Sequence, residues 1–287
     1  MSAPTLACVV LAVGNPPELI GAVQSLLDQD HPSEIVVVNS GGGDATTALA
    51  AFDTVRVIDV HNLLLPGAAR NVGIAATSAP YVAFLAADCI AEPGWVRARL
   101  DAHQLGAPAV ASAVTNPYRR NLIAWTMYVS LFSTRMPGTP SDKALLYGVS
   151  YDRGLFDRFG VFREDMRGGE DTEFHQRLAP EVAIRWVPEV RTAHRHPRRL
   201  GELLRDHYRR GRRTAAAWDQ LDGYRELTVA KNVVRRAPTS ARTAWRAAAS
   251  GERRWVAAAA TILVWPTVAY ALGALSHAVA PAAQAQR

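Results

Sequence analysis

The sequence predicts an α/β protein: a mostly parallel central sheet with helices on both faces, followed by a helical C-terminal segment with one transmembrane helix. Two observations predict the sheet. Short, continuously apolar runs recur through the first 115 residues, and segments with helical spacing separate them. Strands that are apolar throughout are buried on both faces, as in parallel sheets covered by helices. A third observation, a long stretch without charge near the C-terminus, predicts the membrane helix.

The first 115 residues alternate between expected strands and helices. Strands are expected at Leu6–Val13, Ile35–Val38, Val55–Val60, Tyr81–Leu85 and Ala109–Val114. Helices are expected after Pro16-Pro17, over Ala45–Ala51 with Asp44 as cap, and over Pro66–Ala76. Such sheets bind ligands at the carboxyl ends of their strands, which here carry Gly14-Asn15, Asn39-Ser40 and Ala86-Ala87-Asp88.

The middle of the chain mixes apolar helical segments with short strands. Asn116–Pro140 has many apolar residues and few charges. This pattern predicts either a core helix or an amphipathic helix lying on a bilayer, and the apolar C-terminus favours the second. Leu145–Tyr151 predicts a strand, and Arg153–Phe159 predicts a short helix. Two more short strands are expected at Ala183–Val187 and Val190–His194.

An arginine-rich helix is expected over Leu200–Trp218. Arg205, Arg209 and Arg213 recur every four residues and therefore share one face of that helix. Such a face is either solvated or binds diphosphate or anionic lipid headgroups, and the density of arginines favours a phosphate or membrane contact.

Two adjacent carboxylates, Glu170 and Asp171, follow Gly168-Gly169 at the start of an expected helix. Carboxylates at a helix N-terminus are stabilised by the free N–H groups and the dipole, so they are consistent with a helix cap. They are equally consistent with a general base, which needs a fixed carboxylate beside the proton that it removes. Spacing alone does not separate the two hypotheses.

The charge is distributed unevenly along the chain. Residues 1–114 carry 4 basic and 10 acidic side chains, whereas residues 115–287 carry 28 and 16. A uniformly basic chain is typical of nucleic-acid binding. A basic second half followed by an apolar tail instead indicates a membrane surface, so we expect a membrane partner and no nucleic acid. The two cysteines, Cys8 and Cys89, exclude a disulfide scaffold.

The expected transmembrane helix is Trp255–Leu275. As a helix it would be about 31 Å long, which matches the hydrocarbon thickness of a bilayer. The alternative is an Ala-rich helix packed on the preceding domain. Six arginines precede the stretch between residues 235 and 254, against a single acid, Glu252. The positive-inside rule then places the N-terminal domain in the cytoplasm of a single-pass protein of the cell membrane.

Four stretches in the same order resemble the motifs of family 2 glycosyltransferases. They read LACVVLAVGNPPELIGAVQSLLDQDHPSEIVVVNSGGGD, PGAARNVGIAATSAPYVAFLAADC, ALLYGVSYDRGLFDRFG and GGEDTEFHQRL, and together they cover about residues 5–215. The resemblance implies a GT-A fold. We expect a catalytic domain (1–218) with a nucleotide-sugar half (1–115) and an acceptor half (116–218). A basic juxtamembrane linker or helix (219–254), the span (255–275) and a tail (276–287) are expected to follow.

The resemblance implies transfer of a sugar from a nucleotide-diphosphate donor to an acceptor hydroxyl, with inversion. Asp171 would then be the catalytic base, with Glu170 beside it as orienting group or substitute. Asp88 corresponds to the last acid of the family's D-x-D motif, which binds Mg²⁺ or Mn²⁺, and His194 to a metal- or diphosphate-contacting histidine. The donor-binding residues implied are Val13, Asn15, Asn39, Gly41, Arg70, Ala87, Asp88, Arg209 and Arg213.

Two positions depart from the family pattern. The first acid of D-x-D is Ala86, and the acid that ends the second strand is Asn39. Asn39 can still donate and accept hydrogen bonds, whereas Ala86 can do neither. The acceptor expected is a lipid-linked or polysaccharide molecule at the cytoplasmic membrane face. The alternative is a catalytically degenerate GT-A-like protein that binds or scaffolds within a glycan assembly complex.

Overall fold

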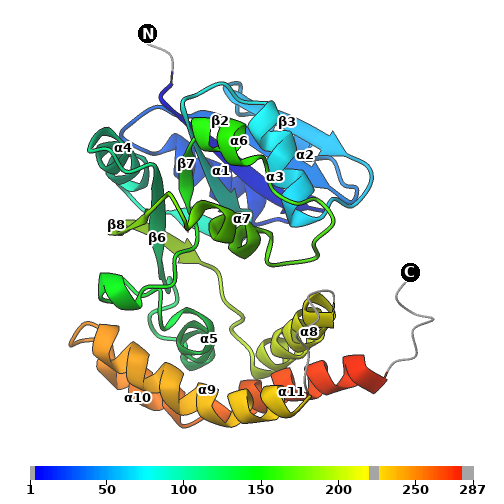
Figure 1. Cartoon of the computed structure of the whole chain (residues 1–287), viewed down its shortest axis with the longest axis vertical. Helices are drawn as coiled ribbons and strands as arrows, with labels where there is room; N and C mark the ends of the chain where they lie inside the picture. The colour runs from blue at the N-terminus through cyan, green and yellow to red at the C-terminus, as the bar shows by residue number, and fades with distance from the viewer. Residues whose placement is uncertain (1–3, 220–225, 280–287) are drawn as a thin grey trace. The chain divides into compact units, whose positions relative to one another are not determined.

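The computed structural model describes residues 4–219 and 226–279, and the chain divides into two compact units (Figure 1). The first unit combines Met1–Thr115 with Ala144–Arg195, and the second combines Asn116–Lys143 with His196–Arg287. Asn116–Lys143 therefore belongs with the C-terminal helices. The chain passes from the first unit to the second after Thr115, where the sequence analysis placed a boundary. The expected division into a catalytic domain and later segments stays a prediction.

The first unit is built on one eight-stranded sheet with the order β3-β2-β1-β4-β7-β6-β8-β5. Strands β1 to β4 are mutually parallel, β6 is parallel to β8, and β7 and β5 run antiparallel to their neighbours. The expected mostly parallel sheet is confirmed. The strands are Leu6–Val13 (β1), Glu34–Ser40 (β2), Val55–Val60 (β3), Tyr81–Ala86 (β4), Cys89–Ala91 (β5), Ala109–Thr115 (β6), Ser150–Asp152 (β7) and Ile184–His194 (β8).

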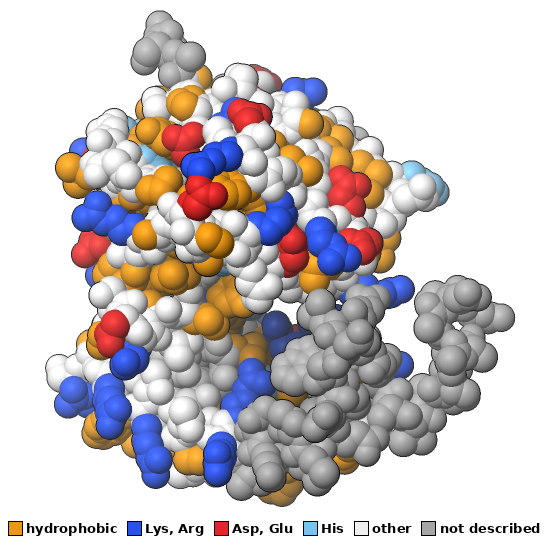
Figure 2. Space-filling model, in the orientation of Figure 1, with side chains coloured by type: hydrophobic (Ala, Val, Ile, Leu, Met, Phe, Trp, Pro, Cys, Tyr) orange, Lys and Arg blue, Asp and Glu red, His pale blue; other side chains and the backbone are white. Residues whose placement is uncertain are grey.

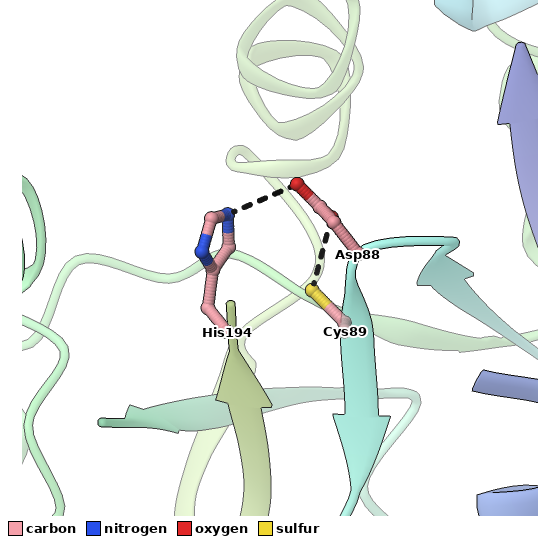
Figure 3. Close-up of side chains that lie close together, drawn as sticks. All are labelled: Asp88, Cys89 and His194. Atoms are coloured by element: carbon pink, nitrogen blue, oxygen red, sulfur yellow. Dashed lines mark hydrogen bonds and ion pairs between the residues drawn. The ribbon is translucent and has the colours of Figure 1, made fainter. Parts of the chain in front are cut away.

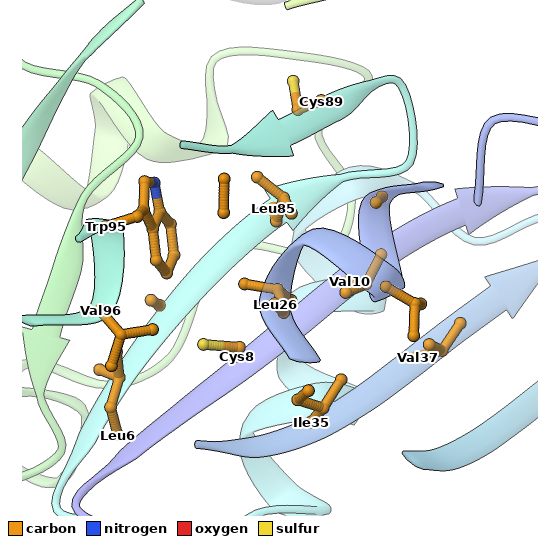
Figure 4. Close-up of a cluster of buried hydrophobic side chains, with 14 of the residues drawn as sticks. Leu6, Cys8, Val10, Leu26, Ile35, Val37, Leu85, Cys89, Trp95 and Val96 are labelled. Carbon is orange, nitrogen blue, oxygen red and sulfur yellow. The ribbon is translucent and has the colours of Figure 1, made fainter. Parts of the chain in front are cut away.

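Helices cover both faces of this sheet. They are Leu19–Leu27 (α1), Ala45–Ala48 (α2), Pro66–Ala75 (α3), Trp95–Gln104 (α4), Gly154–Phe159 (α6) and Glu170–Leu178 (α7). Alternate residues of β1 enter two different cores, since Cys8 and Val10 pack with Trp95 in one (Figure 4), and Val9 packs with Phe174 in the other. This period of two is what a strand buried on both faces requires.

Four expected elements of the first unit differ from the structure. The two strands expected around Pro188 form one strand, β8, whose pairing with β6 shifts register at this point. Proline has no N–H to donate to the ladder, which accounts for the shift. Of the strand expected at Leu145–Tyr151, only its end forms, in β7. Helix α2 is shorter than expected, although the Asp44 side chain does cap it by accepting a hydrogen bond from the Thr47 N–H.

The second unit is helical in the described residues. Its helices are Leu122–Phe132 (α5), Leu200–Asp219 (α8), Glu226–Ala247 (α9), Arg253–Ala260 (α10) and Val264–Val279 (α11), with a short 3-10 turn at Ser141–Lys143. Trp125, Met127 and Val129 of α5 are all buried. Helix α5 is therefore a core helix of this unit, packed against α9 and α10, and the placement of Asn116–Pro140 on a bilayer is wrong.

The expected single transmembrane helix is also wrong as a continuous element. Within residues 4–219 and 226–279, no single helix has the length and composition to cross a membrane. Helices α10 and α11 meet these criteria only as a pair, and the pair is bent by 53°. Pro266 explains the break, because its ring clashes with the carbonyl of Ile262 in a continuous helix and it lacks an N–H. Of the basic segment 219–254, expected as a linker or helix, much forms the helix α9.

Helices α8 and α11 cross at two glycines. A Cβ on Gly211 would lie 2.0 Å from the Tyr270 carbonyl oxygen, and a Cβ on Gly273 would lie 2.0 Å from the Tyr208 carbonyl oxygen. The backbones are thus in contact, and neither glycine can gain a side chain without moving the other helix.

We expect Gly273→Ala to destabilise the chain by about 1–3 kcal/mol, because the added methyl forces the crossing apart. The matched control is Gly201→Ala on α8, where a Cβ meets nothing within 4 Å. The control should stabilise slightly, since alanine favours helix over glycine by up to about 1 kcal/mol. Urea unfolding of both variants measures the difference, and equal effects would contradict the close crossing.

Candidate active site

The loops after β1 and β2 are joined by backbone hydrogen bonds. The Gly14 N–H donates to the Ser40 carbonyl at 2.9 Å, and the Gly41 N–H donates to the carbonyls of Val60 and Asn62. Gly41 has a φ of 75°, and Asn15 has a φ of 50°, a left-handed conformation that asparagine tolerates better than most residues. The two loops form one edge at the carboxyl ends of the strands, where ligands of such sheets bind.

Asn39 lies beneath this edge and is fully buried. Its Oδ1 accepts from the Asn15 N–H at 2.9 Å, and its Nδ2 donates to the Gly42 carbonyl at 3.1 Å and to Asp59 Oδ1 at 2.7 Å. Both amide hydrogens are thus used inside the protein. Asn39 joins the two loops and orients Asp59, a carboxylate at the edge that the sequence analysis did not identify.

Asp59 is held as a carboxylate by a dense set of donors. Besides Asn39, the N–H groups of Ala45 and Thr46 and the Thr46 hydroxyl donate to it. Partial loss of solvent raises the pKa of Asp59, but the hydrogen bonds from Asn39, Thr46 and Ala45 outweigh it and hold the pKa below its usual value. Asn39 thus occupies the position where the family pattern has an acid, and a carboxylate, Asp59, lies beside it on the third strand.

Val13 and Ala87 lie at the same edge. Val13 ends β1 and is 59% exposed, next to the Gly41 turn. Ala87 follows β4 and is buried, with its N–H donating to the Leu11 carbonyl at 2.9 Å. This hydrogen bond holds the turn between β4 and β5, and with it the next residue, Asp88, at the end of the parallel strands.

Asp88, Cys89 and His194 come together in the structure (Figure 3). The antiparallel pairing of β5 with β8 sets Cys89 opposite His194, and the Arg195 N–H donates to the Asp88 carbonyl. The Asp88 carboxylate lies 3.6 Å from His194 Nε2, and the Cys89 thiol donates to it over 3.5 Å. The Asp88 side chain is about half exposed, so it is open to a ligand.

These three side chains have the composition of a small metal site. Each offers one ligand atom, and the three atoms lie within 4.8 Å of one another. A carboxylate oxygen and an imidazole nitrogen are ligands that suit Mn²⁺, and the carboxylate also suits Mg²⁺. The residues therefore fit the divalent metal expected from the sequence. The sequence analysis did not predict Cys89 as a neighbour of the site, although it directly follows Asp88.

The two adjacent carboxylates begin α7. Gly169 immediately before them has a φ of 86°, which turns the chain into the helix. Glu170 is buried and paired with the Arg70 guanidinium of α3. Arg70 itself packs against the rings of Phe84 and Phe162, with its Cζ 5.5 Å and 5.1 Å from the ring centres. Arg70, which we expected to bind the sugar donor, therefore forms an ion pair with Glu170.

Asp171 has a different environment from its neighbour. It is only partly buried, and its Oδ1 accepts the N–H of Thr172 at 2.8 Å. Glu170 is thus neutralised by an arginine, whereas Asp171 has one oxygen on its own helix and reaches solvent. Of the two, Asp171 is the carboxylate placed to accept a proton from a bound molecule.

A tyrosine–histidine pair near α7 was missed in the sequence analysis. The Tyr151 hydroxyl and His175 Nε2 are 2.8 Å apart. Burial and then the charge of Arg70 lower the pKa of His175 to about 4, so it is neutral near pH 7. His175 lies four residues after Asp171 and therefore on the same side of α7, a spacing that could have identified it.

Arg209 and Arg213 lie in the second unit. They share a face of α8 with Arg205, as their spacing predicts, and all three are exposed. The part of Arg209 and Arg213 in donor binding stays a prediction.

A family model described as glycosyl transferase family 2 matches residues 8–155, just over half of the chain. This chain belongs to glycosyltransferase family 2. The match covers the strands, loops and turn that carry Asp88, the candidate metal ligand. The resemblance inferred from the four sequence stretches is thereby confirmed, and with it the glycosyltransferase class.

Individual proteins similar to this family 2 chain are also glycosyltransferases. Glycosyltransferase AglE of Haloferax volcanii is 24% identical over 223 residues, which is 73% of each chain. The pre-mycofactocin glycosyltransferase of Mycobacterium tuberculosis is 28% identical over 190 residues, which is 59% of this chain but only 39% of that protein. The mannosyltransferase PcManGT of Pyrobaculum calidifontis, solved with GDP-Man and Mn²⁺, superposes with a TM-score of 0.58 at 16% identity, over 96% of this chain and 88% of its own. That likeness confirms the GT-A fold.

Proposed function

We propose that this family 2 chain is an inverting glycosyltransferase that uses a nucleotide-diphosphate sugar. The observation that supports this best is the unequal pair on α7, in which Arg70 neutralises Glu170 and Asp171 is left open. Asp171 is proposed to take the proton of the acceptor hydroxyl. The oxygen then attacks the anomeric carbon from the side opposite the diphosphate, a new C–O bond forms, and the bond to the departing nucleoside diphosphate breaks.

Asp88 and His194 are proposed to hold a divalent metal, Mg²⁺ or Mn²⁺. When bound, such an ion neutralises charge on the leaving diphosphate. The edge formed by Val13, Asn15 and Gly41 is proposed to contact the nucleotide, with Asp59 and Asn39 fixing its shape. Ala86 supplies no ligand, so Asp88 carries the acidic part of the metal site without the second acid of the family motif.

The acceptor is proposed to be a lipid-linked or polysaccharide molecule in glycan or glycolipid synthesis at the cytoplasmic face of the cell membrane. The basic and apolar character of the C-terminal helices supports this proposal. The finer assignments, including the sugar transferred, depend on side chains of the donor and acceptor pockets rather than on the fold.

Asp88→Ala is expected to abolish metal-dependent donor binding. Calorimetric titration of GDP-, UDP- and dTDP-sugars, with and without Mn²⁺, should identify one donor whose Kd tightens at least about tenfold with the metal in the unaltered chain. In the variant that difference should vanish, because the carboxylate ligand is gone. Asp53→Ala, which removes another exposed carboxylate of the same unit, is the control.

Two results would count against this assignment. Binding that is equally tight without metal, and unaffected by Asp88→Ala, would exclude the proposed metal site. Metal-dependent binding without any nucleoside diphosphate release, across a panel of lipid and glycan acceptors, would favour the degenerate binding protein for which Ala86 is the structural argument.

A further inference from the structure

The second unit carries large apolar side chains on its surface that nothing in the described residues covers. Helices α9, α10 and α11 lie in one layer along the lower edge of this unit in Figure 1, below α5 and α8. Helices α9 and α10 pack against α5, and α11 packs mainly against α8. The opposite faces of the three helices are open, and their composition differs from one helix to the next.

Helix α11 presents an apolar stripe to the outside. Its buried side includes Thr267, Gly273 and Ala274, of which Gly273 and Ala274 lie against α8. Its other side consists of five large apolar residues whose spacing places them within about 100° of one another. These five residues, called the apolar stripe, are each between 44% and 58% exposed: Val264, Trp265, Val268, Leu272 and Leu275. A solvent-facing helix surface normally carries charges at such positions.

Helix α9 presents a line of arginines on its open side. Arg235, Arg242 and Arg246 are exposed and lie within about 40° of one another around the helix, opposite the buried Ser240 and Ala244. We call these three residues the arginine line. None of them has an acidic partner among the ion pairs of the described residues.

Two tryptophan rings lie against arginine guanidinium groups where α9 meets α10. Trp245 is 45% exposed, and the guanidinium of Arg253 lies 5.6 Å from its ring centre. Arg254 lies 5.8 Å from the ring of Trp255. Between the helices runs a groove of about 490 Å³, lined by Ala241, Arg242, Trp245, Arg246, Val256, Ala257 and Ala260. The groove lining thus combines apolar side chains with two arginines. Figure 2 shows Lys and Arg along this edge of the molecule.

We propose that the open side of α9, α10 and α11 docks on the surface of an anionic lipid bilayer, with the helices lying in the plane of the interface. The apolar stripe enters the acyl boundary, and the arginine line binds lipid phosphates. Amphipathic helices with tryptophan and leucine on one side and arginine on another bind membranes in this way. Arginine and exposed tryptophan together fit the boundary between headgroups and acyl chains.

Charge is the reason to choose a bilayer as the partner. A second copy of this surface would bring the arginine line and Arg253 and Arg254 against another set of like charges, which opposes self-association. An anionic bilayer supplies both the negative charge and the apolar phase that this surface lacks. The bend between α10 and α11 and the packing of α11 against α8 are consistent with a helix that lies on the membrane rather than one that crosses it.

Vesicle flotation of the full chain tests the proposal and needs no nucleotide sugar, so its outcome is independent of the transfer reaction. We expect binding to vesicles of phosphatidylcholine with 30% phosphatidylglycerol, and at least about tenfold weaker binding to phosphatidylcholine alone. The same loss is expected in 0.5 M salt, which screens the headgroup charge. Alkaline carbonate should release the bound protein, as for a protein that lies on the membrane.

Two double variants separate the parts of the surface. Arg242→Gln with Arg246→Gln should weaken binding to anionic vesicles at least about tenfold, and Trp265→Ser with Leu272→Ser should do the same for both lipid compositions. The matched controls lie in the first unit: Arg185→Gln with Arg191→Gln for charge, and Leu105→Ser with Val161→Ser for apolar exposure. The controls should bind vesicles as tightly as the unaltered chain does. Unfolding curves of every variant test whether it is folded.

Three outcomes would overturn the proposal. Absence of flotation, or flotation unaffected by the surface variants, would exclude a bilayer as the partner of this surface. Protein that resists carbonate extraction and has a protease-protected C-terminus would identify a span. A dimer measured by light scattering that dissociates in the Trp265 and Leu272 variant, without loss of vesicle binding, would identify a second copy as the partner.

Discussion

Asp171→Asn is expected to lower the rate of sugar transfer by about 10²- to 10⁴-fold, while donor binding changes less than about threefold. The loss is that of a general base, which contributes a factor of this size when its geometry is fixed. The amide keeps the shape of the side chain and can still accept the Thr172 N–H, so α7 should keep its start. The measurement is nucleoside diphosphate release with the donor found by titration, beside the Kd for that donor.

Glu170→Gln provides the contrast. Its carboxylate is buried against Arg70, so removing the charge leaves a guanidinium without its partner between two aromatic rings. We expect the unfolding temperature of this variant to fall and that of Asp171→Asn to stay unchanged. Glu173→Gln, which removes the charge from a partly buried ion pair with Arg177, should leave the rate unchanged and lower the stability less than Glu170→Gln does.

The assignment of the base fails if the rates respond in the opposite order. An Asp171→Asn variant that transfers sugar at the normal rate, beside a folded Glu170→Gln variant that does not, would make Glu170 the proton acceptor. Loss of donor binding in Asp171→Asn would instead place this carboxylate in the donor site.

Asn39→Asp, which restores the acid of the family pattern, is expected to destabilise the chain by about 3 kcal/mol near pH 7. The substitution replaces a buried amide that donates to the Gly42 carbonyl and to Asp59. A carboxylate there accepts only, so both hydrogen bonds are lost and two negative charges lie side by side. Urea unfolding of the variant and the unaltered chain measures the difference.

The loss should depend on pH in a defined direction. In the folded variant, the neighbouring charge and burial raise the pKa of the new carboxyl above its value in the unfolded chain. The folded state then binds the extra proton first, so stability is recovered as the pH falls through the raised pKa and lost as it rises. A variant as stable as the unaltered chain, with no pH dependence, would mean that the Asn39 amide does not face Asp59.

The control for Asn39→Asp is a double variant in which the amide and the carboxylate exchange positions. Adding Asp59→Asn to Asn39→Asp again sets an amide against a carboxylate, with the donor on the third strand. We expect this double variant to recover part of the lost stability at pH 7, although the Gly42 carbonyl stays without its donor. A double variant less stable than the sum of the single ones would show that the positions do not act as a pair.

Local patterns in the sequence determined much of the first unit. Strands β1 and β3 have the predicted bounds, the Asp44 cap forms, and α7 begins at the two carboxylates that follow a pair of glycines. Each of these depends on residues within a few positions of one another. Helix α4 escaped prediction because its buried side includes Arg99 and His103, charged or polar types that disguise the amphipathic pattern.

Arg99 of α4 is a core residue whose partners lie in other segments of the chain. It is fully buried and donates to the carbonyls of Val110 and Gly148, two segments that come close only in the folded chain. Burial lowers the pKa of Arg99 to about 9, because the charged form is disfavoured away from water. The two hydrogen bonds to backbone carbonyls of other segments stabilise the buried guanidinium. Nothing within α4 itself indicates that an arginine belongs to the core.

The candidate site residues, by contrast, depend on contacts between segments far apart in the chain. The sequence indicated Asp88, His194, Glu170 and Asp171 through the motifs of the family. Only the tertiary structure brought Cys89 and His194 together across the β5–β8 pair, set Arg70 against Glu170 and bent the apolar C-terminal stretch into two helices. The reason is physical: periodicity and capping act over one or two turns of chain, whereas strand pairing and the packing of helices are decided by surfaces that exist only once the chain has folded.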